Sequence, residues 1–230
     1  MTAPGLTLSV VIPVYGCADC LETLRARLAT AMERHRISYE IVFVDDASRD
    51  AAASVLARLA AGSPQVRVIS LQENRGQPAA IAAGLALAAG QWCAVMDCDL
   101  QDPPELLPEM LTTVVERADI LVTRRLRHSQ VWWRRVASST FGPVARRRQN
   151  STLIGRYSVF SVISRRAVIG YLQRAEREVV YLPVLERLGL PIVSFDYARA
   201  GRHTGRSSYT TLALARRAIR VLLAPGARKN

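Results

Sequence analysis

Asp97 and Asp99 are the clearest candidates for chemistry in this chain of 230 residues. The two aspartates lie two positions apart, directly after an apolar run of strand length from Trp92 to Met96. Paired carboxylates at the point where a buried strand opens into a loop are hard oxygen ligands for a divalent cation, and such a cation neutralises a diphosphate. The alternative is a solvated acidic turn that caps a helix beginning at Pro103.

Two further groups of polar residues follow predicted strands and favour the first interpretation. Asp45 and Asp46 end the second apolar run of the chain, and Arg75 follows the third. Because parallel strands place their carboxyl ends at one edge of a sheet, we expect these residues to lie near Asp97. Taken singly, Asp45 and Asp46 would equally suit the capping of the next turn. The convergence of three separate segments is what argues for one cleft.

The elements that carry these residues alternate along the first half of the chain. Short β-branched, apolar runs predict strands, and segments with helical spacing predict the helices between them. We expect strands at Leu8–Val14, Glu40–Asp45, Val66–Ser70, Trp92–Met96 and Ile120–Thr123. We expect helices from the candidate N-cap Asp19, after Asp50, at Pro78–Ala89 and at Pro104–Arg117. Such alternation predicts right-handed crossovers and an α/β fold, with a mostly parallel sheet flanked by helices.

The second half of the chain has weaker patterns. We expect a helix introduced by Trp132 and Trp133, a strand at Tyr157–Ile163, a helix at Val179–Leu188 and a strand at Ile192–Tyr197. From Thr210 to Leu223 a basic C-terminal amphipathic helix separates an apolar side from an arginine side. This pattern suits a helix lying on a bilayer, and it equally suits a helix packed on its own domain. We predict one α/β domain over residues 1–209, followed by this helix and a tail over residues 210–230.

The net charge of +12 is distributed unevenly along the chain. Residues 1–119 contain 9 basic and 15 acidic side chains, whereas residues 120–230 contain 22 and 4. Such an asymmetry predicts an anionic partner. Nucleic acid and an anionic membrane surface both satisfy it, but no nucleic-acid motif is present, so we expect no nucleic acid partner. The basic residues are arginines apart from Lys229, which either phosphate contacts or a GC-rich coding sequence would explain.

Neither a membrane span nor a secretory leader is predicted. No stretch approaches the roughly 18 uncharged apolar residues that a span needs. We therefore expect the protein on the cytoplasmic side, where free cysteines suit a reducing compartment. Cys17 and Cys20 have the spacing of a metal or redox pair. Because Cys93 and Cys98 complete no zinc pattern, we do not expect that use.

Five blocks of the sequence carry a family resemblance. These blocks are Val10–Tyr15, Val44–Ser48, Asn74–Gln77 with Ala80 and Gly84, Asp97–Glu105, and Arg202–Tyr209. In this order they resemble family 2 of the glycosyltransferases. Within that family they are most similar to the branch that attaches sugars to polyprenyl phosphates, which includes dolichyl-phosphate mannose synthase and bacterial glucosyl relatives. The blocks cover nearly the whole chain, and the match is weakest between about Arg124 and Ser161.

The resemblance implies a nucleotide-binding, GT-A-like fold and a nucleoside-diphosphate sugar as the donor. It implies that Asp46 binds the nucleobase. Pro13 and Tyr15 would flank that base, and Asp45 would lie beside it. Arg75 would meet the diphosphate, helped by the positive end of the helix that follows.

For the metal, the resemblance adds Gln101 as a third ligand beside Asp97 and Asp99. Mg²⁺ or Mn²⁺ is the expected ion, since hard carboxylate and phosphate oxygens suit both. Inverting transfer needs a neutralised leaving group and an acceptor oxygen held in line behind the anomeric carbon. We therefore expect Asp99 to be essential for catalysis.

A polyprenyl phosphate as acceptor would call for cations rather than for a general base, because its oxygen is already anionic. Arg124, after the last regular strand of the first half, and Arg202, in the fifth block, are the best candidates to hold that phosphate. Arg134 and Arg135 are weaker ones. The expected partners are then the nucleoside-diphosphate sugar, the polyprenyl phosphate, and a membrane surface or a membrane partner protein. We expect a peripheral location on the cytoplasmic face.

The chain departs from the family pattern in three places. Gly16-Cys17 stands where the family has Asn-Glu, Ser158–Ser161 stands where it has Gly-Asp-Phe-Arg, and Ser208 replaces a lysine. These changes leave two alternatives open. One keeps the donor chemistry but uses a soluble, polysaccharide or natural-product acceptor. The other is an inactive subunit that binds a nucleotide sugar or a membrane.

Overall fold

One sheet organises the computed structural model, which describes residues 7–126, 151–175 and 180–198. Its strands are β1 (Leu8–Val14), β2 (Tyr39–Asp45), β3 (Val66–Ser70), β4 (Trp92–Val95), β5 (Ile120–Leu126), β6 (Ser161–Ser164) and β7 (Ile192–Ala198). Their order across the sheet is β3-β2-β1-β4-β6-β5-β7. Neighbouring strands run parallel except around β6, which is antiparallel to both β4 and β5. The predicted mostly parallel sheet is therefore confirmed.

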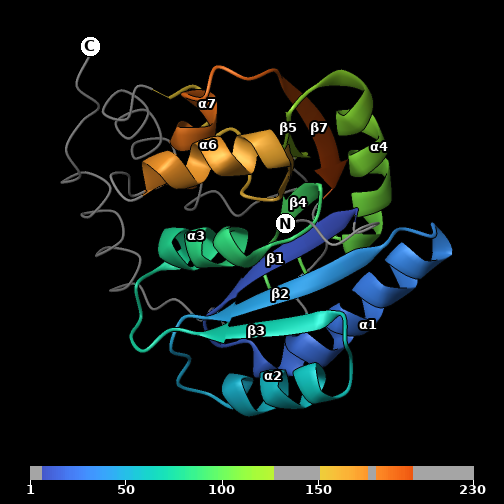
Figure 1. Ribbon diagram of the computed structural model, residues 1–230, viewed down its shortest axis with the longest axis vertical. Coiled ribbons are helices and arrows are strands. Elements are labelled where there is room, and N and C mark those ends of the chain that lie inside the picture. Colours follow the sequence, from blue (N-terminus) through green and yellow to red (C-terminus); the bar gives the residue numbers. More distant parts are fainter. Residues whose placement is uncertain (1–6, 127–150, 176–179, 199–230) are drawn as a thin grey trace.

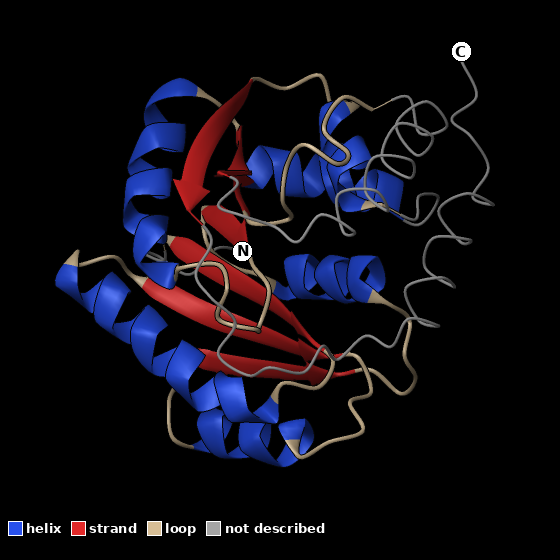
Figure 2. Cartoon of the chain, turned by 180° about the vertical axis from the view of Figure 1, so that it is seen from behind, coloured by secondary structure: helices blue, strands red, loops and turns tan. Residues whose placement is uncertain are grey.

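Helices cover both faces of this sheet (Figure 1). They are α1 (Ala18–Arg34), α2 (Ala52–Ala61), α3 (Gln77–Leu87), the 3-10 helix η1 (Pro104–Leu106), α4 (Leu107–Arg117), α6 (Arg165–Ala175) and α7 (Tyr181–Glu186). The helices α1, α2 and α4 pack on one face, and α3, α6 and α7 pack on the other. Figure 2 shows the same three layers from behind, with the strands between the helices.

The alternation of strand side chains explains why both faces are covered. In β1, Val10 and Ile12 pack with α1 and α2, whereas Val11 between them packs with α3. In β2, Phe43 faces the first layer and Val44 faces the second. All of these side chains are fully buried. A strand buried on both faces is apolar at consecutive positions, as central strands of parallel sheets are.

Two predicted features of the fold are wrong. Asp19 does not cap α1, because the helix already begins at Ala18, and the Ala18 N–H is bound by Asp50, from the chain just before α2, at 3.1 Å. The strand predicted at Tyr157–Ile163 begins only at Ser161. The Tyr157 N–H instead bonds to the carbonyl of residue 153 in a turn.

One element was missed and others cannot be compared. The helix α6 had no counterpart among the predicted elements, although Ser164 accepts a hydrogen bond from the Ala167 N–H as an N-cap does. The helix predicted after Trp132 and the amphipathic helix Thr210–Leu223 lie outside the described residues. Within the described ranges, no helix combines the length and apolarity that crossing a membrane requires.

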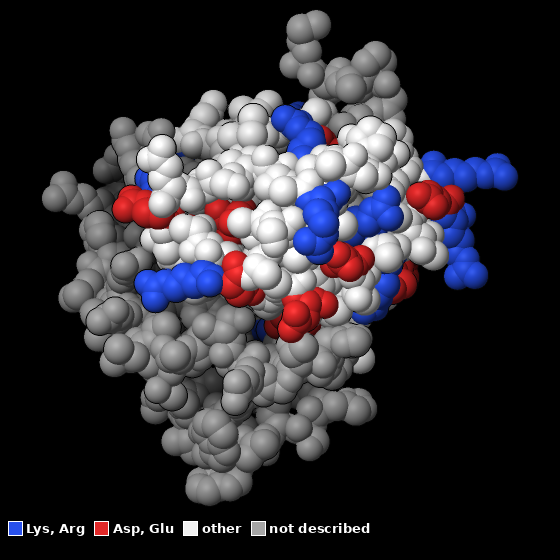
Figure 3. Space-filling view, turned by 90° about the horizontal axis from the view of Figure 1, so that it is seen from below, with Lys and Arg blue, Asp and Glu red and all other residues white. Residues whose placement is uncertain are grey.

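The surface over the first half of the chain carries charges of both signs. Figure 3 shows one such face, on which acidic and basic side chains are interspersed. Arg58 of α2 and Glu22 of α1 form an ion pair of 2.9 Å. Such exposed ion pairs contribute little to stability.

Candidate functional site

The loops after β1, β2 and β4 are tied together at the carboxyl edge of the sheet. The Asp46 N–H bonds to the Val14 carbonyl at 2.8 Å, which joins the end of β2 to the end of β1. The Gly16 N–H bonds to the Ser48 hydroxyl at 3.0 Å. Met96 extends the pairing of β4 with β1 through a 3.2 Å bond to the Val11 carbonyl. The predicted convergence of the strand ends on one edge is therefore present.

Asp46 holds the turn that carries Arg75. One carboxylate oxygen of Asp46 accepts the Arg75 N–H at 2.7 Å, and the other accepts the Gly76 N–H at 2.8 Å. Gly76 has a φ of 88°, a conformation that glycine adopts without a steric penalty. Burial raises the pKa of Asp46, and the two N–H donors act in the opposite direction. The carboxylate thus fixes the start of α3 and the position of Arg75.

Asp45 closes a small loop beside it. The Asp45 carboxylate accepts the Ser48 N–H at 3.0 Å, and the same Ser48 binds Gly16 after β1. Pro13 and Tyr15, on the chain leading into that loop, are half-buried. All four predicted residues of the nucleotide side therefore sit on adjoining strand ends.

The acidic loop after β4 lies next to α3. Asp97 accepts a hydrogen bond from the Gln77 side-chain amide at 2.7 Å. Asp99 accepts the Gln101 N–H at 3.2 Å, which closes a tight turn. Leu100, between them, is 2% exposed and packs into the core. Anchoring of Leu100 holds the two flanking polar side chains at the sheet edge.

Unfavourable backbone conformations gather around this edge. Four non-glycine residues of the described chain have positive φ, and three of them, Cys17, Ala47 and Leu100, lie in the loops after β1, β2 and β4. The fourth, Arg36, follows the end of α1. Such strain costs about 1–3 kcal/mol per residue and persists where the surrounding structure enforces it, as at functional sites.

The oxygen ligands predicted for a metal fit a divalent cation. The Gln101 Oε1 atom is buried and accepts no hydrogen bond from the described residues. A buried oxygen without a donor needs another partner, and a cation is one. The side chain of Asp97 is 26% exposed, so it is accessible from solvent. No group of three or more His, Cys, Asp or Glu side chains surrounds a metal-sized site in the described ranges, so further ligands would come from the substrate.

Cys98, between the two aspartates, faces the core rather than the edge. Its hydrogen bond with Cys17 and its burial raise the pKa of the Cys98 thiol well above the usual range. The thiol therefore stays neutral near pH 7. No disulfide joins any of the four cysteines, all of which lie in the described part of the chain.

The two consecutive arginines of β5 have different surroundings. Arg124 is exposed and binds Asp196 of β7 through two bonds of 2.8 and 2.6 Å. Arg125 points to the acidic loop, with its Nη2 atom 3.9 Å from Asp97 and 3.6 Å from Asp102. The sequence indicated Arg124 as a site residue, but it is Arg125 that the structure brings beside the acidic loop.

Arg125 belongs to a polar network that the sequence analysis missed. Its Nε atom donates to the Tyr197 hydroxyl at 3.1 Å, and its Nη2 atom donates to Ser158 at 2.7 Å. Tyr197 in turn donates to Asp102. Burial, with the Asp102 charge, raises the pKa of Tyr197 to about 12, so the hydroxyl keeps its proton. Burial opposes the charge of Arg125, but the Asp102 and Tyr197 oxygens outweigh it and raise the pKa of Arg125.

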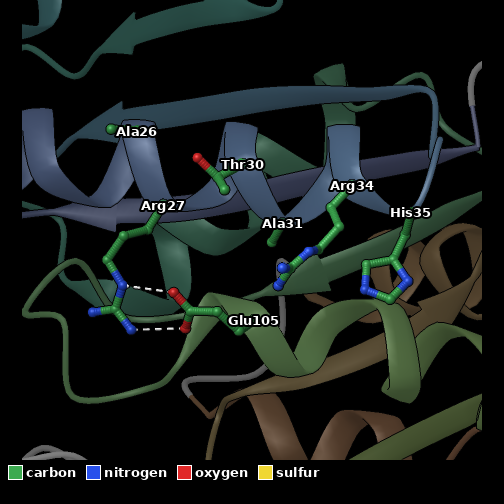
Figure 4. A pocket seen from close by; sticks show the side chains of 7 residues that line it. All are labelled: Ala26, Arg27, Thr30, Ala31, Arg34, His35 and Glu105. Atoms are coloured by element: carbon green, nitrogen blue, oxygen red, sulfur yellow. Dashed lines mark hydrogen bonds and ion pairs between the residues drawn. The ribbon is translucent and has the colours of Figure 1, made fainter.

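A hollow of about 300 Å³ lies between α1 and Glu105 of η1 (Figure 4). Its lining consists of Ala26, Arg27, Thr30, Ala31, Arg34, His35 and Glu105. Arg27 and Glu105 form a double hydrogen bond of 2.7 Å across it, which lowers the pKa of Glu105. This ion pair ties η1, directly after the acidic loop, to α1. None of the predicted site residues lines the hollow, so we do not assign the site to it.

Arg202 lies outside the described residues, as do Arg134 and Arg135. Of the predicted site residues, the structure gathers Asp45, Asp46 and Arg75 around one turn and Asp97, Asp99 and Gln101 in the next loop. Gln77 and Asp46 join these two groups, because α3 begins at the Asp46-bound turn and Gln77 binds Asp97.

Residues 9–172 match the family model of glycosyl transferase family 2. The chain belongs to this family. The matched region includes β1 to β6 and therefore the loops after β1, β2 and β4 at the carboxyl edge of the sheet. The predicted resemblance is confirmed.

Curated relatives of similar sequence are undecaprenyl-phosphate 4-deoxy-4-formamido-L-arabinose transferases. The protein from Proteus mirabilis is 31% identical over 209 residues, which are 90% of this chain and 64% of the relative. The one from Pectobacterium atrosepticum is 31% identical over 210 residues, with the same two shares. The chain thus spans somewhat less than two thirds of the length of these relatives.

Solved structures show the same GT-A fold at lower sequence identity. Glucosyl-3-phosphoglycerate synthase from Mycobacterium tuberculosis, in complex with Mn²⁺, UDP and phosphoglyceric acid, has a TM-score of 0.63 at 19% identity, over 95% of this chain and 76% of that one. A mannosyltransferase from Pyrobaculum calidifontis, in complex with GDP-Man and Mn²⁺, has a TM-score of 0.61 at 19% identity, over 97% and 65%. The fold of this chain is therefore that of GT-A glycosyltransferases.

Proposed function

We propose that this glycosyltransferase moves a sugar, with inversion, from a nucleoside diphosphate to a polyprenyl phosphate. The observation that carries the proposal is the meeting of the Asp46 turn and the Asp97–Gln101 loop at the carboxyl edge of a family 2 domain. Ligands of open α/β sheets bind outside the carboxyl ends of the strands. The undecaprenyl-phosphate transferases that match 90% of the chain support the class of acceptor.

The donor would lie across the ends of β1 and β2. In this arrangement Asp46 contacts the nucleobase, Pro13 and Tyr15 flank it, and Asp45 shapes the loop beside it. The Asp46 carboxylate has two bonds from backbone N–H groups, and an ionised carboxylate has room for about four. Capacity for a nucleobase donor therefore remains. Arg75, on the turn that Asp46 fixes, would meet the diphosphate together with the positive end of α3.

Asp97, Asp99 and Gln101 would hold a divalent cation, Mg²⁺ or Mn²⁺. Such a cation neutralises the diphosphate leaving group when bound. The chain's own contribution is to hold the ligand oxygens in a fixed loop, through Gln77 on Asp97 and the buried Leu100. Asp99 would be catalytic in this sense, because it would touch the cation that touches the reacting diphosphate.

The acceptor phosphate would approach from the basic side. In a single displacement, one phosphate oxygen bonds to the anomeric carbon as the diphosphate leaves with the electrons of the broken bond. Arg202 and Arg124 would hold that phosphate. The Arg124 guanidinium is bound to Asp196, so an acceptor phosphate would have to replace that carboxylate.

Contact with a membrane would follow from the lipid acceptor. We propose that residues 1–209 form the catalytic domain and that residues 210–230, with their separated apolar and arginine sides, bind the cytoplasmic membrane surface or a membrane partner. Replacement of Leu212, Ile219 and Leu222 by serine should then reduce co-sedimentation with anionic vesicles. Equal co-sedimentation of the variant and the unaltered protein would refute this binding mode.

A transfer assay tests the proposed reaction. The purified protein is incubated with a panel of nucleotide sugars and extracted polyprenyl phosphate, with Mn²⁺, Mg²⁺ or a chelator, and products are identified by mass spectrometry. We expect a glycosylated polyprenyl phosphate only where metal is present. Transfer to soluble acceptors alone would replace the lipid acceptor. If the protein bound the donor but neither transferred the sugar nor hydrolysed the donor, it would be an inactive binding subunit.

A further inference from the structure

A partly buried polar network contacts the acidic loop. It consists of Asp102, from the end of that loop, Arg125 of β5 and Tyr197 of β7. Asp102 is 0% exposed and Tyr197 is 3% exposed. These three residues are far apart in the sequence and meet because β5 and β7 are parallel neighbours at this edge. Asp102 and Tyr197 are buried, whereas the Arg125 side chain is 35% exposed. Because buried polar groups are costly unless they are hydrogen-bonded, the bond between Tyr197 and Asp102 favours a defined geometry.

A continuous series of contacts connects the sheet to the acidic loop. The rings of Phe160 and Tyr197 pack edge to face, with 5.6 Å between their centroids, and this packing orients the Tyr197 ring. The Tyr197 hydroxyl accepts from Arg125 at 3.1 Å and donates to Asp102. Arg125 also reaches Asp97, whose Oδ2 atom lies 3.9 Å from Nη2. The network therefore contacts the acidic loop at both its first and its last aspartate.

The loop carries three aspartates, Asp97, Asp99 and Asp102. Within the described residues, Arg125 lies 3.9 Å from Asp97 and 3.6 Å from Asp102. Asp102 is fully buried in the network, whereas the side chain of Asp97 is 26% exposed and therefore accessible to a cation.

We propose that Tyr197 and Arg125 are positioning residues that set the cation affinity of the acidic loop. They hold Asp102 at one end and Asp97 at the other, so that Asp97, Asp99 and Gln101 present their oxygens together. This inference rests on the proposed metal site, and it adds two residues from β5 and β7 to it. Partners that orient metal ligands typically change metal affinity or activity by about 10–100-fold when they are removed.

Tyr197→Phe is the sharpest test of this proposal. It deletes one hydroxyl, keeps the ring that packs on Phe160, and leaves the charges of Asp102 and Arg125 in place. Tyr181→Phe is the matched control. Tyr181 is also buried and its hydroxyl also contacts a side chain, that of Ser161 at 3.1 Å, but it belongs to α7. Both variants lose one buried hydroxyl, so a general loss of stability should affect both.

The first measurement is Mn²⁺ binding without substrate, read from the electron paramagnetic resonance signal of the free ion. We expect Tyr197→Phe to weaken Mn²⁺ binding by about tenfold and Tyr181→Phe to leave it within about twofold of the unaltered protein. Arg125→Lys, which keeps the charge but loses the fork, should also weaken binding. Equal Mn²⁺ affinity of both tyrosine variants would overturn the proposal.

The second measurement needs no metal and separates this inference from the proposed function. Amide hydrogen exchange of residues 97–102 is followed in metal-free protein. We expect faster exchange in that loop for Tyr197→Phe and unchanged exchange there for Tyr181→Phe. Unchanged exchange in both variants would overturn the positioning role. If the unaltered protein bound no Mn²⁺ while the loop still loosened in Tyr197→Phe, the metal site of the proposed function would fail and the positioning role would stand.

Discussion

Two buried acidic residues at opposite ends of β2 have different partners. Glu40, at the beginning of the strand, is 6% exposed, and Asp46, just after its end, is 3% exposed. The Glu40 carboxylate accepts bonds from the Ser9 hydroxyl and the Ala89 N–H at 2.6 Å each, and from the Arg67 guanidinium at 3.1 Å. Within the described residues, the Asp46 carboxylate accepts hydrogen bonds from two backbone N–H groups, both in the turn before α3.

The difference separates a structural carboxylate from one suited to binding. Glu40 joins β1, β2, β3 and the end of α3 at the edge where parallel strands begin, and a cation compensates its charge. Asp46 lies at the edge where they end, its hydrogen bonds from the described residues come from backbone N–H groups, and burial raises its pKa. A buried charge with spare capacity at a strand end is poised for a ligand, whereas one enclosed by fixed donors holds elements together.

The largest effect on activity is expected from the binding edge. Asp99→Asn should reduce the rate of sugar transfer by more than about a hundredfold. The effect should exceed that of losing a residue that only orients a metal ligand, because Asp99 is proposed to bind the metal directly. The fold should persist, since this loop side chain contributes little packing. Transfer kinetics at saturating Mn²⁺, with a melting curve beside them, check both statements. Turnover equal to that of the unaltered protein would remove Asp99 from the site.

A smaller effect is expected at Asp46. Asp46→Asn leaves one of the two N–H groups of the Arg75 turn without an acceptor, so nucleotide binding should weaken by about ten- to a hundredfold. Because burial raises the pKa of Asp46, its ionised form lowers the free energy of unfolding at pH 7, and asparagine removes that cost. The free energy of unfolding should therefore change less in Asp46→Asn than in Glu40→Gln. Calorimetric titration with nucleoside diphosphates and chemical denaturation measure the two quantities.

The opposite pattern is expected for Glu40→Gln. In the variant, the NH₂ group of glutamine replaces one carboxylate oxygen and cannot accept a hydrogen bond from the Ser9 hydroxyl or the Ala89 N–H. The free energy of unfolding should therefore fall by about 1.5–3 kcal/mol. The melting temperature should fall by roughly 4–10 °C. The folded fraction should bind nucleotide as before. If donor affinity fell while stability did not, the division of roles between the two ends of β2 would be wrong.

The smallest effect concerns the Arg27–Glu105 pair. Because Arg27 lowers the pKa of Glu105, the pair stabilises the fold above the unfolded pKa of Glu105, and this contribution is lost as pH falls through the lower folded value. Glu105 is half exposed, so the contribution is at most about 1 kcal/mol. Glu105→Gln should therefore lower the melting temperature near pH 7 and converge with the unaltered protein in acid. A difference in melting temperature between the two proteins that stayed the same at every pH would contradict this.

The strands of the first half were predictable because each is an apolar run bounded by a turn. Leu8–Val14 and Val66–Ser70 have the predicted bounds. The helix α6 was missed because Arg165 and Arg166 interrupt its apolar pattern at the start, although Ser164 is a good N-cap. Asp19 is the local candidate for a cap, but the acceptor of the Ala18 N–H is Asp50, which lies 32 residues away in the sequence. Local patterns do not contain such long-range contacts.

The site shows the same limit. The acidic loop was predictable from its residues and from their place after a strand. The network under it was not, because Arg125 and Tyr197 are 72 residues apart and meet only through the pairing of β5 with β7. Alternation along β5 would have indicated that only one of its two arginines faces the loop, but not which one. The position of Arg124 beside Asp196 required the register of the sheet.

Metal-dependent binding of a nucleoside diphosphate tests the central claim, that the carboxyl edge is the donor site, most directly. Calorimetric titrations with UDP and GDP, with and without Mn²⁺, are made on the unaltered protein, Asp99→Asn and Glu40→Gln. We predict binding that requires Mn²⁺ in the unaltered protein and in folded Glu40→Gln, and its loss in Asp99→Asn. Binding that is independent of Mn²⁺ and equally strong in Asp99→Asn would contradict the account.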